Sequence, residues 1–187
     1  MTAWTAEGWL NGAEWLPSPN FGPRPADAEV SLAVIHNISL PPGQFSGRFV
    51  EDFFLNQLDA TVDPYFSTIS GLQVSSHFYI RRDGRLIQFV SVDDRAWHAG
   101  QSSWCGRDNC NDWSVGIELE GTDDLPFEPQ QYAKLWRVLA AVRQRYPLTG
   151  VAGHSDIAPG RKTDPGMGFD WAAVAVRFPD LALPGTG

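Results

Sequence analysis

HFYIRRDGRLIQFV, residues 77–90, is the stretch that decides the fold class. Two short runs rich in aromatic and β-branched residues, His77 to Ile80 and Leu86 to Val90, stand on either side of Asp83 and Gly84. An Asp-Gly pair accepts the positive φ angles of a tight turn, so it is typical of the connection between two antiparallel strands. The stretch therefore predicts a β-hairpin, and a sheet that contains a hairpin is not strictly parallel.

Further strands and helices are expected on both sides of this hairpin. Similar strand-like runs cover Leu32 to His36, Val115 to Leu119 and the neighbourhood of Val151. From Pro129 to Tyr146, apolar residues recur at steps of three or four, which predicts an amphipathic helix. Shorter helices are expected at Phe49 to Leu58 and at Trp171 to Phe178. Interspersed strands and helices with one hairpin indicate the α/β or α+β class, with a central mixed β-sheet flanked by helices.

Length and composition fit one compact domain. At 187 residues with 43% hydrophobic content, the chain can bury about two-thirds of its unfolded surface in a single core. Pro and Gly fall singly or in pairs between periodic segments, and neither a linker nor an internal repeat divides the sequence. We therefore expect residues 1–187 to form a single domain.

Charge and the N-terminal segment argue against several classes of protein. With 14 Lys and Arg against 22 Asp and Glu, the net charge is -8, so no general field attracts nucleic acid or anionic lipid. The first residues, MTAWTAEGWLNGAEWL, lack the basic start of a signal peptide, and Glu7 and Glu14 interrupt the apolar stretch that such a peptide needs. No apolar run approaches the roughly 20 residues that cross a bilayer. We expect a cytoplasmic protein with neither a nucleic-acid nor a membrane partner.

The two cysteines are predicted to be free thiols. Cys105 and Cys110 stand in a polar loop, without the second Cys or His pair that a structural zinc site needs. Disulfides are rare in the reducing cytosol, where this chain is expected to reside.

Two of the four histidines stand where predicted strands open into loops. His36 ends the run SLAVIH, His154 follows VAG, and Asp164 comes ten residues after His154. Two imidazoles and a carboxylate are the three protein ligands of a catalytic zinc with one open position. The spacing is no standard zinc motif, however. From spacing alone, hydrogen-bonded strand-end histidines and a turn-forming aspartate are the more frequent alternative.

A second group of polar residues lies on the predicted strand that contains Glu118. Alternation along this strand puts Glu118 and Glu120 on the face opposite its apolar residues. A carboxylate on a largely apolar strand is either a salt-bridged structural group or a general base with a shifted pKa. Lys162, two residues before Asp164, is either an oxyanion-stabilising group or a solvated surface charge. Both alternatives stay open on the residues alone.

Aromatic residues offer one further expectation. Eight tryptophans are many for this length, and aromatic faces can stack on sugar rings or line a peptide groove. Trp97, in RAWHAG, is the one expected in a cleft, because His98 and Gly100 accompany it. Core packing explains the others better.

Five segments taken together carry a resemblance to a known family. They are VIHNISLPPGQF (34–45), SSHFYIRRDG (75–84), DDRAWHAG (93–100), GRDNCNDWSVGIELEGTD (106–123) and GHSDIAPGRKTDPG (153–166). From about Gly8 to Phe178 the chain resembles the AmpD-type 1,6-anhydro-N-acetylmuramyl-L-alanine amidases, with the segments in the family's order. The resemblance implies a central mixed sheet with flanking helices, the fold shared by phage amidases and peptidoglycan recognition proteins.

The resemblance also implies roles for individual residues. The family's ligands for one zinc ion fall on His36, His154 and Asp164, its catalytic carboxylate on Glu118, and its conserved lysine on Lys162. Related amidases often use a tyrosine at the place of Ser76, so the role of base rests on Glu118. Ser155 stands where close relatives more often have cysteine, and we expect no loss of zinc from that difference.

The activity implied is hydrolysis of the amide bond between N-acetylmuramic acid, in its 1,6-anhydro form, and L-alanine of the stem peptide. The expected partner is a small muropeptide, released by wall turnover and recycled in the cytoplasm. Trp97 is expected near the sugar, and Asn37 and Arg107 near the peptide. Two alternatives are a peptidoglycan-binding module that has lost catalysis and a lytic amidase acting on intact murein.

Overall fold

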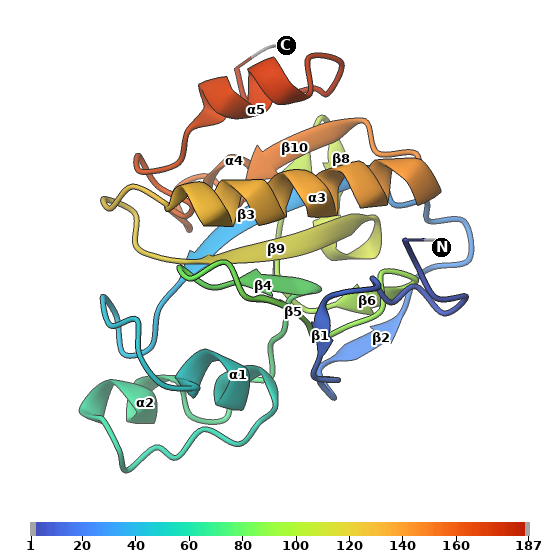
Figure 1. Ribbon diagram of the computed structural model, residues 1–187. Coiled ribbons are helices and arrows are strands. Elements are labelled where there is room, and N and C mark those ends of the chain that lie inside the picture. Colours follow the sequence, from blue (N-terminus) through green and yellow to red (C-terminus); the bar gives the residue numbers. More distant parts are fainter. Residues whose placement is uncertain (1–2, 186–187) are drawn as a thin grey trace.

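The computed structural model describes residues 3–185, and its centre is a six-stranded sheet (Figure 1). The strand order is β1 (Glu14–Trp15), β5 (Leu86–Gln88), β4 (Phe78–Ile80), β9 (Ser114–Glu120), β3 (Leu32–Ile38) and β10 (Gly150–Gly153). The β4–β5 pair is antiparallel and the other neighbours are parallel. The sheet is therefore mixed, and the predicted α/β class is confirmed.

The hairpin inferred from residues 77–90 connects β4 to β5. Arg81 N–H donates to the Arg85 carbonyl, and Gly84 adopts a φ of +81° at the turn. A residue with a Cβ atom is strained at such a φ, which is why the turn needs this glycine. The antiparallel pair in an otherwise parallel sheet thus follows from the local sequence.

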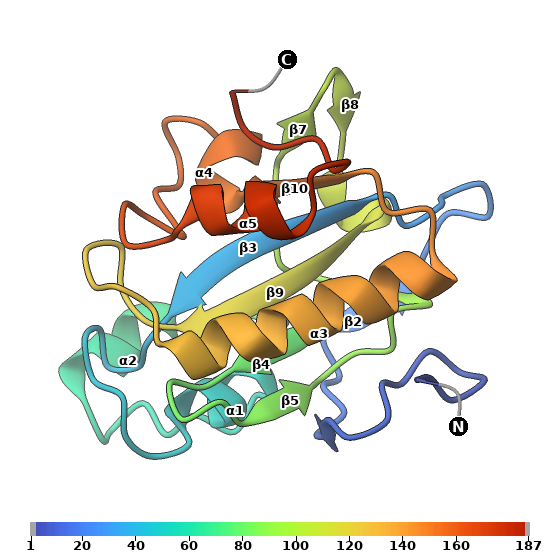
Figure 2. The ribbon, with the colours of Figure 1, turned by 45° about the horizontal axis from the view of Figure 1, so that its top comes forward.

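Helices cover both sides of the sheet. The longest, α3 (Pro129–Arg145), and α5 (Trp171–Arg177) lie over one face, as Figures 1 and 2 show. In the main core, buried side chains of these helices such as Leu135, Leu139 and Val174 pack with strand residues such as Ile35 and Ile117. A second apolar cluster joins α1 (Phe49–Phe54) and α2 (Pro64–Ile69) to β4 and β5. The opposite face of β3 and β10 is left for the short α4 (His154–Ile157) and the loops around it.

Helix α3 begins and nearly ends where the apolar repeat predicts. Pro129 occupies its first turn, and the Glu128 N–H donates to the side-chain oxygen of Gln131. The N-terminal segment packs against the same helix, because Trp4 donates its indole N–H to the Ala141 carbonyl. From residue 3 onward, this segment is therefore part of the fold.

Two predicted element boundaries are wrong. Helix α1 ends at Phe54 instead of Leu58, because Asn56 adopts a left-handed φ of +59° just past its end, a conformation that terminates helices. His154 does not lie in a loop but begins the one-turn helix α4.

Several elements were too short to give a periodic signal in the sequence. Besides β1, α2 and α4, these are β2 (Phe21–Pro23), which pairs with β6 (Asp94–Ala96), β7 (Ser103–Trp104), which pairs with β8 (Arg107–Asp108), and the 3-10 helix η1 (Cys110–Asp112). Cys105 and Cys110 are free thiols, as predicted. The first is exposed and the second is buried. Among residues 3–185, no helix combines the length and the apolar character needed to span a membrane.

Candidate metal and catalytic site

Three chemically active side chains start from the ends of neighbouring parallel strands. His36 lies on β3 and Glu118 on β9, and these two residues are direct partners in the register of the strands. His154 follows directly on β10, the other neighbour of β3. The carboxyl ends of parallel strands meet at one edge of a sheet, where ligands of open α/β sheets bind.

Asp164 reaches this edge from the loop after α4. The Ser155 N–H donates to the Asp164 carbonyl at 2.8 Å, and the Asn37 amide donates to the Pro165 carbonyl at 3.1 Å. The loop is thus tied both to α4 and to β3.

The side chains of His36, His154 and Asp164 converge on one point. His36 Nδ1 lies 3.0 Å from His154 Nδ1 and 3.1 Å from Asp164 Oδ2, and 3.1 Å separate His154 Nδ1 from Asp164 Oδ2. Atoms this close together can share one ion at the roughly 2.0–2.1 Å bond lengths of zinc. The three residues form a group able to hold a metal ion.

The protonation of this group suits a cation. His154 Nε2 lies 3.0 Å from the Ala99 carbonyl oxygen, which can only accept, so Nε2 carries a proton and Nδ1 is the ring nitrogen that faces the metal position. Burial, aided by His154, lowers the pKa of His36 to about 4. Burial works to raise the pKa of Asp164, but hydrogen bonds to His154 and His36 outweigh it and hold that pKa below its usual range. A bound metal ion would take the place of any proton on Nδ1 of the two imidazoles, because neutral imidazole and ionised carboxylate are the forms that bind metal.

Glu118 borders the metal position. Its Oε1 atom lies 4.0 Å from His36 Nδ1, while its Oε2 atom is buried and has no hydrogen-bond partner among the described residues. Burial raises the pKa of Glu118 well above its usual value, Asp164 adds to the rise, and Lys162 opposes it. A buried polar atom left unpaired costs about 1–3 kcal/mol, so such a group is unfavourable unless a ligand or water engages it.

A cleft of about 630 Å³ opens over these groups. Its lining includes His36, Glu118, His154 and Asp164, together with Lys162 and Trp97. A second wall comes from apolar side chains of the α1 and α2 region, among them Phe53, Tyr65 and Leu72. Trp97 and Lys162 thus both line the cleft, and the roles expected of them stay predictions.

Of the two residues expected near the peptide, one lines the cleft and the other lies outside it. Asn37 lines the cleft, but its amide group donates to Asp123 Oδ1 at 2.7 Å and to the Pro165 carbonyl. Arg107 lies on β8 outside the lining of the cleft, with its guanidinium 4.4 Å from the centre of the Trp113 ring. The fold brings Asn37, but not Arg107, into the site.

Sequence reasoning missed the contacts of two residues at this site. His98 Nδ1 lies 2.9 Å from His36 Nε2, and Arg161 donates to the carbonyl oxygens of Ala99 and Gln101. The scarcity of histidine was the only signal for His98. For Arg161 there was none, because nothing in the sequence tells a surface arginine from one that braces a loop.

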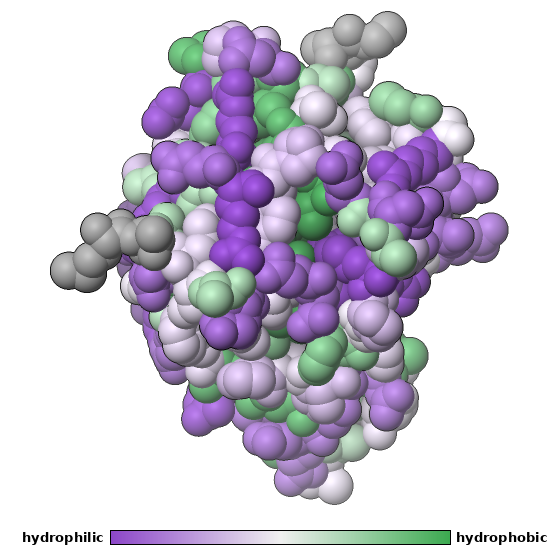
Figure 3. All heavy atoms as spheres, turned by 90° about the vertical axis from the view of Figure 1, so that its right-hand side faces the viewer, coloured by the Kyte–Doolittle hydropathy of each residue, from purple (hydrophilic) through white to green (hydrophobic). Residues whose placement is uncertain are grey.

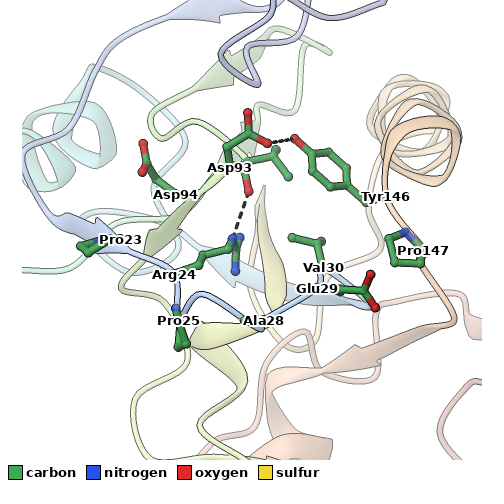
Figure 4. Close-up of a pocket in the computed structure, with 11 residues that line it drawn as sticks. Pro23, Arg24, Pro25, Ala28, Glu29, Val30, Asp93, Asp94, Tyr146 and Pro147 are labelled. Atoms are coloured by element: carbon green, nitrogen blue, oxygen red, sulfur yellow. Dashed lines mark hydrogen bonds between the residues drawn. The ribbon is translucent and has the colours of Figure 1, made fainter.

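A separate hollow of about 500 Å³ lies between β2, β6 and the end of α3 (Figure 4). Arg24 crosses it, but its guanidinium donates to the backbone carbonyls of Val92, Asn111, Asp112 and Ser114. The Tyr146 hydroxyl donates to Asp93, as Figure 4 also shows. In Figure 3, which faces the right-hand side of Figure 1, hydrophilic residues predominate over the upper part of the surface. The polar groups of this hollow hold loops together.

Comparison with protein families gives one match that spans most of the chain. Residues 26–167 match the model of the N-acetylmuramoyl-L-alanine amidase family. The 1,6-anhydro-N-acetylmuramyl-L-alanine amidase AmpD of Citrobacter freundii is 51% identical over 180 residues, which cover 95% of this chain and 94% of that protein.

Solved structures agree with the sequence matches. A crystal structure of a selenomethionine derivative of AmpD has a TM-score of 0.88 and 50% identity, covering 91% of this chain and 97% of the other. The Escherichia coli amidase AmiD, solved with the substrate anhydro-N-acetylmuramic acid-L-Ala-D-γ-Glu-L-Lys, has a TM-score of 0.58 and 32% identity over 82% of this chain and 60% of its own. The expected fold is therefore confirmed at the level of the three-dimensional structure.

Proposed function

The chain belongs to the N-acetylmuramoyl-L-alanine amidase family and is an amidase of the AmpD type, and on this premise we propose that it hydrolyses anhydromuropeptides with one zinc ion held by His36, His154 and Asp164. The bond cleaved joins the lactyl carbonyl of 1,6-anhydro-N-acetylmuramic acid to the nitrogen of L-alanine. One observation carries the proposal: three ligand atoms lie within 3.1 Å of one another beside a buried carboxylate oxygen that has no hydrogen-bond partner within residues 3–185.

The donor set fits zinc. Two imidazoles and one carboxylate leave a fourth tetrahedral position open, the arrangement of catalytic zinc sites. Zinc bound there would supply a Lewis acid and lower the pKa of a water toward about 7.

Glu118 acts as the base and then as the acid. It takes a proton from the attacking water, and it returns this proton to the alanine nitrogen when the C–N bond breaks. The proximity of its Oε1 atom to His36 supports this role, because it puts the carboxylate beside the residues that would hold the metal ion. The charge of Lys162 favours the ionised carboxylate against the effect of burial.

Lys162 stabilises the charge that develops on the carbonyl oxygen. The residue lines the cleft, and its charge reaches both His36 and Glu118. An ammonium group there interacts more strongly with an oxyanion than with a neutral carbonyl, which lowers the barrier selectively.

Substrate contacts divide between the two ends of the cleft. Trp97 offers an aromatic face to the sugar. Asn37 meets the peptide while its amide holds the loop of Asp164 in place. Arg107 contacts the peptide only where a stem reaches as far as β8, so Arg107→Ala should raise KM for long stem peptides and leave KM for short ones unchanged.

The activity belongs to recycling in the cytoplasm. The two free thiols suit a reducing compartment, where disulfides do not persist. Fractionation of cells that produce the full-length protein tests this assignment, and activity recovered with the cell envelope would contradict it.

The decisive experiment compares two substrates under controlled metal content. Zinc in the purified protein is measured, and release of free stem peptide is followed by mass spectrometry before and after chelation. We expect one zinc per chain, rapid cleavage of an anhydromuramyl tripeptide, and loss of cleavage on chelation. Faster cleavage of intact sacculi would favour a lytic amidase. Binding of the tripeptide without release of peptide would favour a non-catalytic module.

A further inference from the structure

Two consecutive residues contact the two imidazoles of the metal centre at the ring nitrogens that face away from the metal position. His36 turns Nδ1 toward the metal position, and its Nε2 atom lies 2.9 Å from Nδ1 of His98. The Nε2 atom of His154 lies 3.0 Å from the carbonyl oxygen of Ala99. Residues 98–99 therefore meet both imidazoles, although His36 and His154 are 118 positions apart in the chain.

The protons of this arrangement can be assigned atom by atom. If His36 Nδ1 offers its lone pair to a metal ion, Nε2 carries the proton and donates a hydrogen bond to His98 Nδ1. His98 then carries its own proton on Nε2, which lies 3.1 Å from the Ser114 hydroxyl oxygen, an acceptor. The series from His36 through His98 to Ser114 gives every imidazole nitrogen a compatible role.

The position of the His98 ring is built into the fold. A Cβ atom on Gly116 would lie 2.4 Å from His98 Cγ, so only glycine at that place on β9 leaves room for the ring. On the other side, the buried Asn111 side chain accepts hydrogen bonds from the backbone N–H groups of His98 at 3.1 Å and Ala99 at 2.8 Å. The segment is fixed from two directions, which a ring packed by chance would not require.

We propose that His98 is a positioning residue of the metal centre, which fixes the tautomer and the orientation of His36 by accepting a hydrogen bond from its Nε2–H group. This inference rests on the proposed zinc site. Outer partners of metal-bound histidines commonly change metal affinity about 10- to 100-fold, because they orient the ring and raise the basicity of the bound nitrogen.

The test measures the zinc dissociation constant by competition with a chelator. His98→Phe keeps a ring but removes the acceptor, and it should weaken zinc binding about 10- to 100-fold. His98→Asn, whose amide oxygen can take the place of Nδ1, should recover most of this loss. The matched control is His77→Phe. The centre of this buried ring lies 5.8 Å from that of His98, and its nitrogens meet Gly116, Asp94 and Arg24 but none of the three ligands, so zinc affinity should stay at the wild-type value.

A spectroscopic measurement on the wild-type protein does not depend on whether the variants fold. In zinc-loaded protein labelled with ¹⁵N, His36 should show a proton on Nε2 and His98 a proton on Nε2 but none on Nδ1. Zinc binding by His98→Phe as tight as by the wild type, or a proton found on His98 Nδ1, would overturn the proposal. A wild-type protein that binds no zinc at all would instead overturn the proposed function, so the two failures are distinguishable.

Discussion

Glu118 combines two features that packing alone would not favour in one residue. Its side chain is buried in the central strand β9, and one of its oxygens has no partner among the described groups. Alternation along the strand indicated its face, but the sequence left open whether a salt bridge satisfies it. Arg81 lies near Glu120 and Glu51 instead, so no arginine among residues 3–185 pairs with Glu118, which lines the cleft.

Replacing this carboxylate separates catalysis from folding. Glu118→Gln keeps the size of the side chain and removes the base, so kcat should fall about 10²- to 10⁴-fold. Zinc content should stay at the wild-type level. The melting temperature of the metal-free variant should equal or exceed that of the wild type, because the buried charge is removed. Activity near wild type in a zinc-loaded variant would reject Glu118 as the base.

Replacing Asp164, in contrast to Glu118, should remove the metal ion itself. Asp164→Ala removes one of three ligand atoms, so zinc is expected to be lost and activity with it. Metal analysis after gel filtration measures this directly. Asp124→Ala is the matched control, since Asp124 lines the same cleft but is not one of the three ligands. Full zinc occupancy in Asp164→Ala would remove that residue from the metal site.

At the scale of elements, the wall of the cleft is attached to the sheet through a buried ion network. Glu51 on α1 is 1% exposed and pairs with Arg81 at 3.1 Å, and Arg81 also lies 3.5 Å from Glu120 on β9. Arg81 thus stands between two buried carboxylates. It couples α1, and with it the apolar wall of the cleft, to the strand that bears Glu118.

Removing the arginine should destabilise the fold strongly. Arg81→Met leaves Glu120 buried without its cation and leaves Glu51 with Arg85 alone, 3.8 Å away, and breaking such a buried pair costs about 3–5 kcal/mol. Arg143→Ala is the control, because its pair with Asp180 is exposed and such pairs contribute about 0–1 kcal/mol. Urea unfolding of the two variants at neutral pH gives both values. Equal stability of Arg81→Met and wild type would show that the network adds nothing to the attachment of α1.

The elements also show which parts of the fold could be predicted from the sequence. The hairpin at Asp83-Gly84 and helix α3 carry strong local signals, a turn pair and a long apolar repeat, and both are found where expected. Elements of two to six residues, such as α2, α4 and β6, have no room for a repeat, and tertiary contacts determine them. The end of α1 depends on the left-handed conformation of Asn56, which helix periodicity does not reveal.

At the scale of the molecule, the residues of the site could be proposed from the sequence, but their convergence in space could not be derived from it. His36, His154 and Asp164 are separated by up to 128 positions, and their convergence requires β3 to lie between β9 and β10 in parallel register. Spacing along the chain contains no information on that register, so the resemblance to a family had to supply the ligand set. The contacts of His98 with His36 and of Asn111 with the backbone at His98 depend on the same register, and sequence reasoning did not find them.

Because the three ligands come from separate segments, a bound metal ion should stabilise the fold as well as take part in catalysis. An ion held by His36, His154 and Asp164 joins β3, α4 and the loop after it, and the unfolded chain offers no such group. Free zinc at about 1,000 times its dissociation constant should stabilise the folded state by about 4 kcal/mol. The melting temperature of the metal-free protein should therefore rise with added zinc, whereas that of Asp164→Ala should not change. Equal responses of the two proteins would mean that zinc acts elsewhere on the chain, because the variant lacks the third ligand.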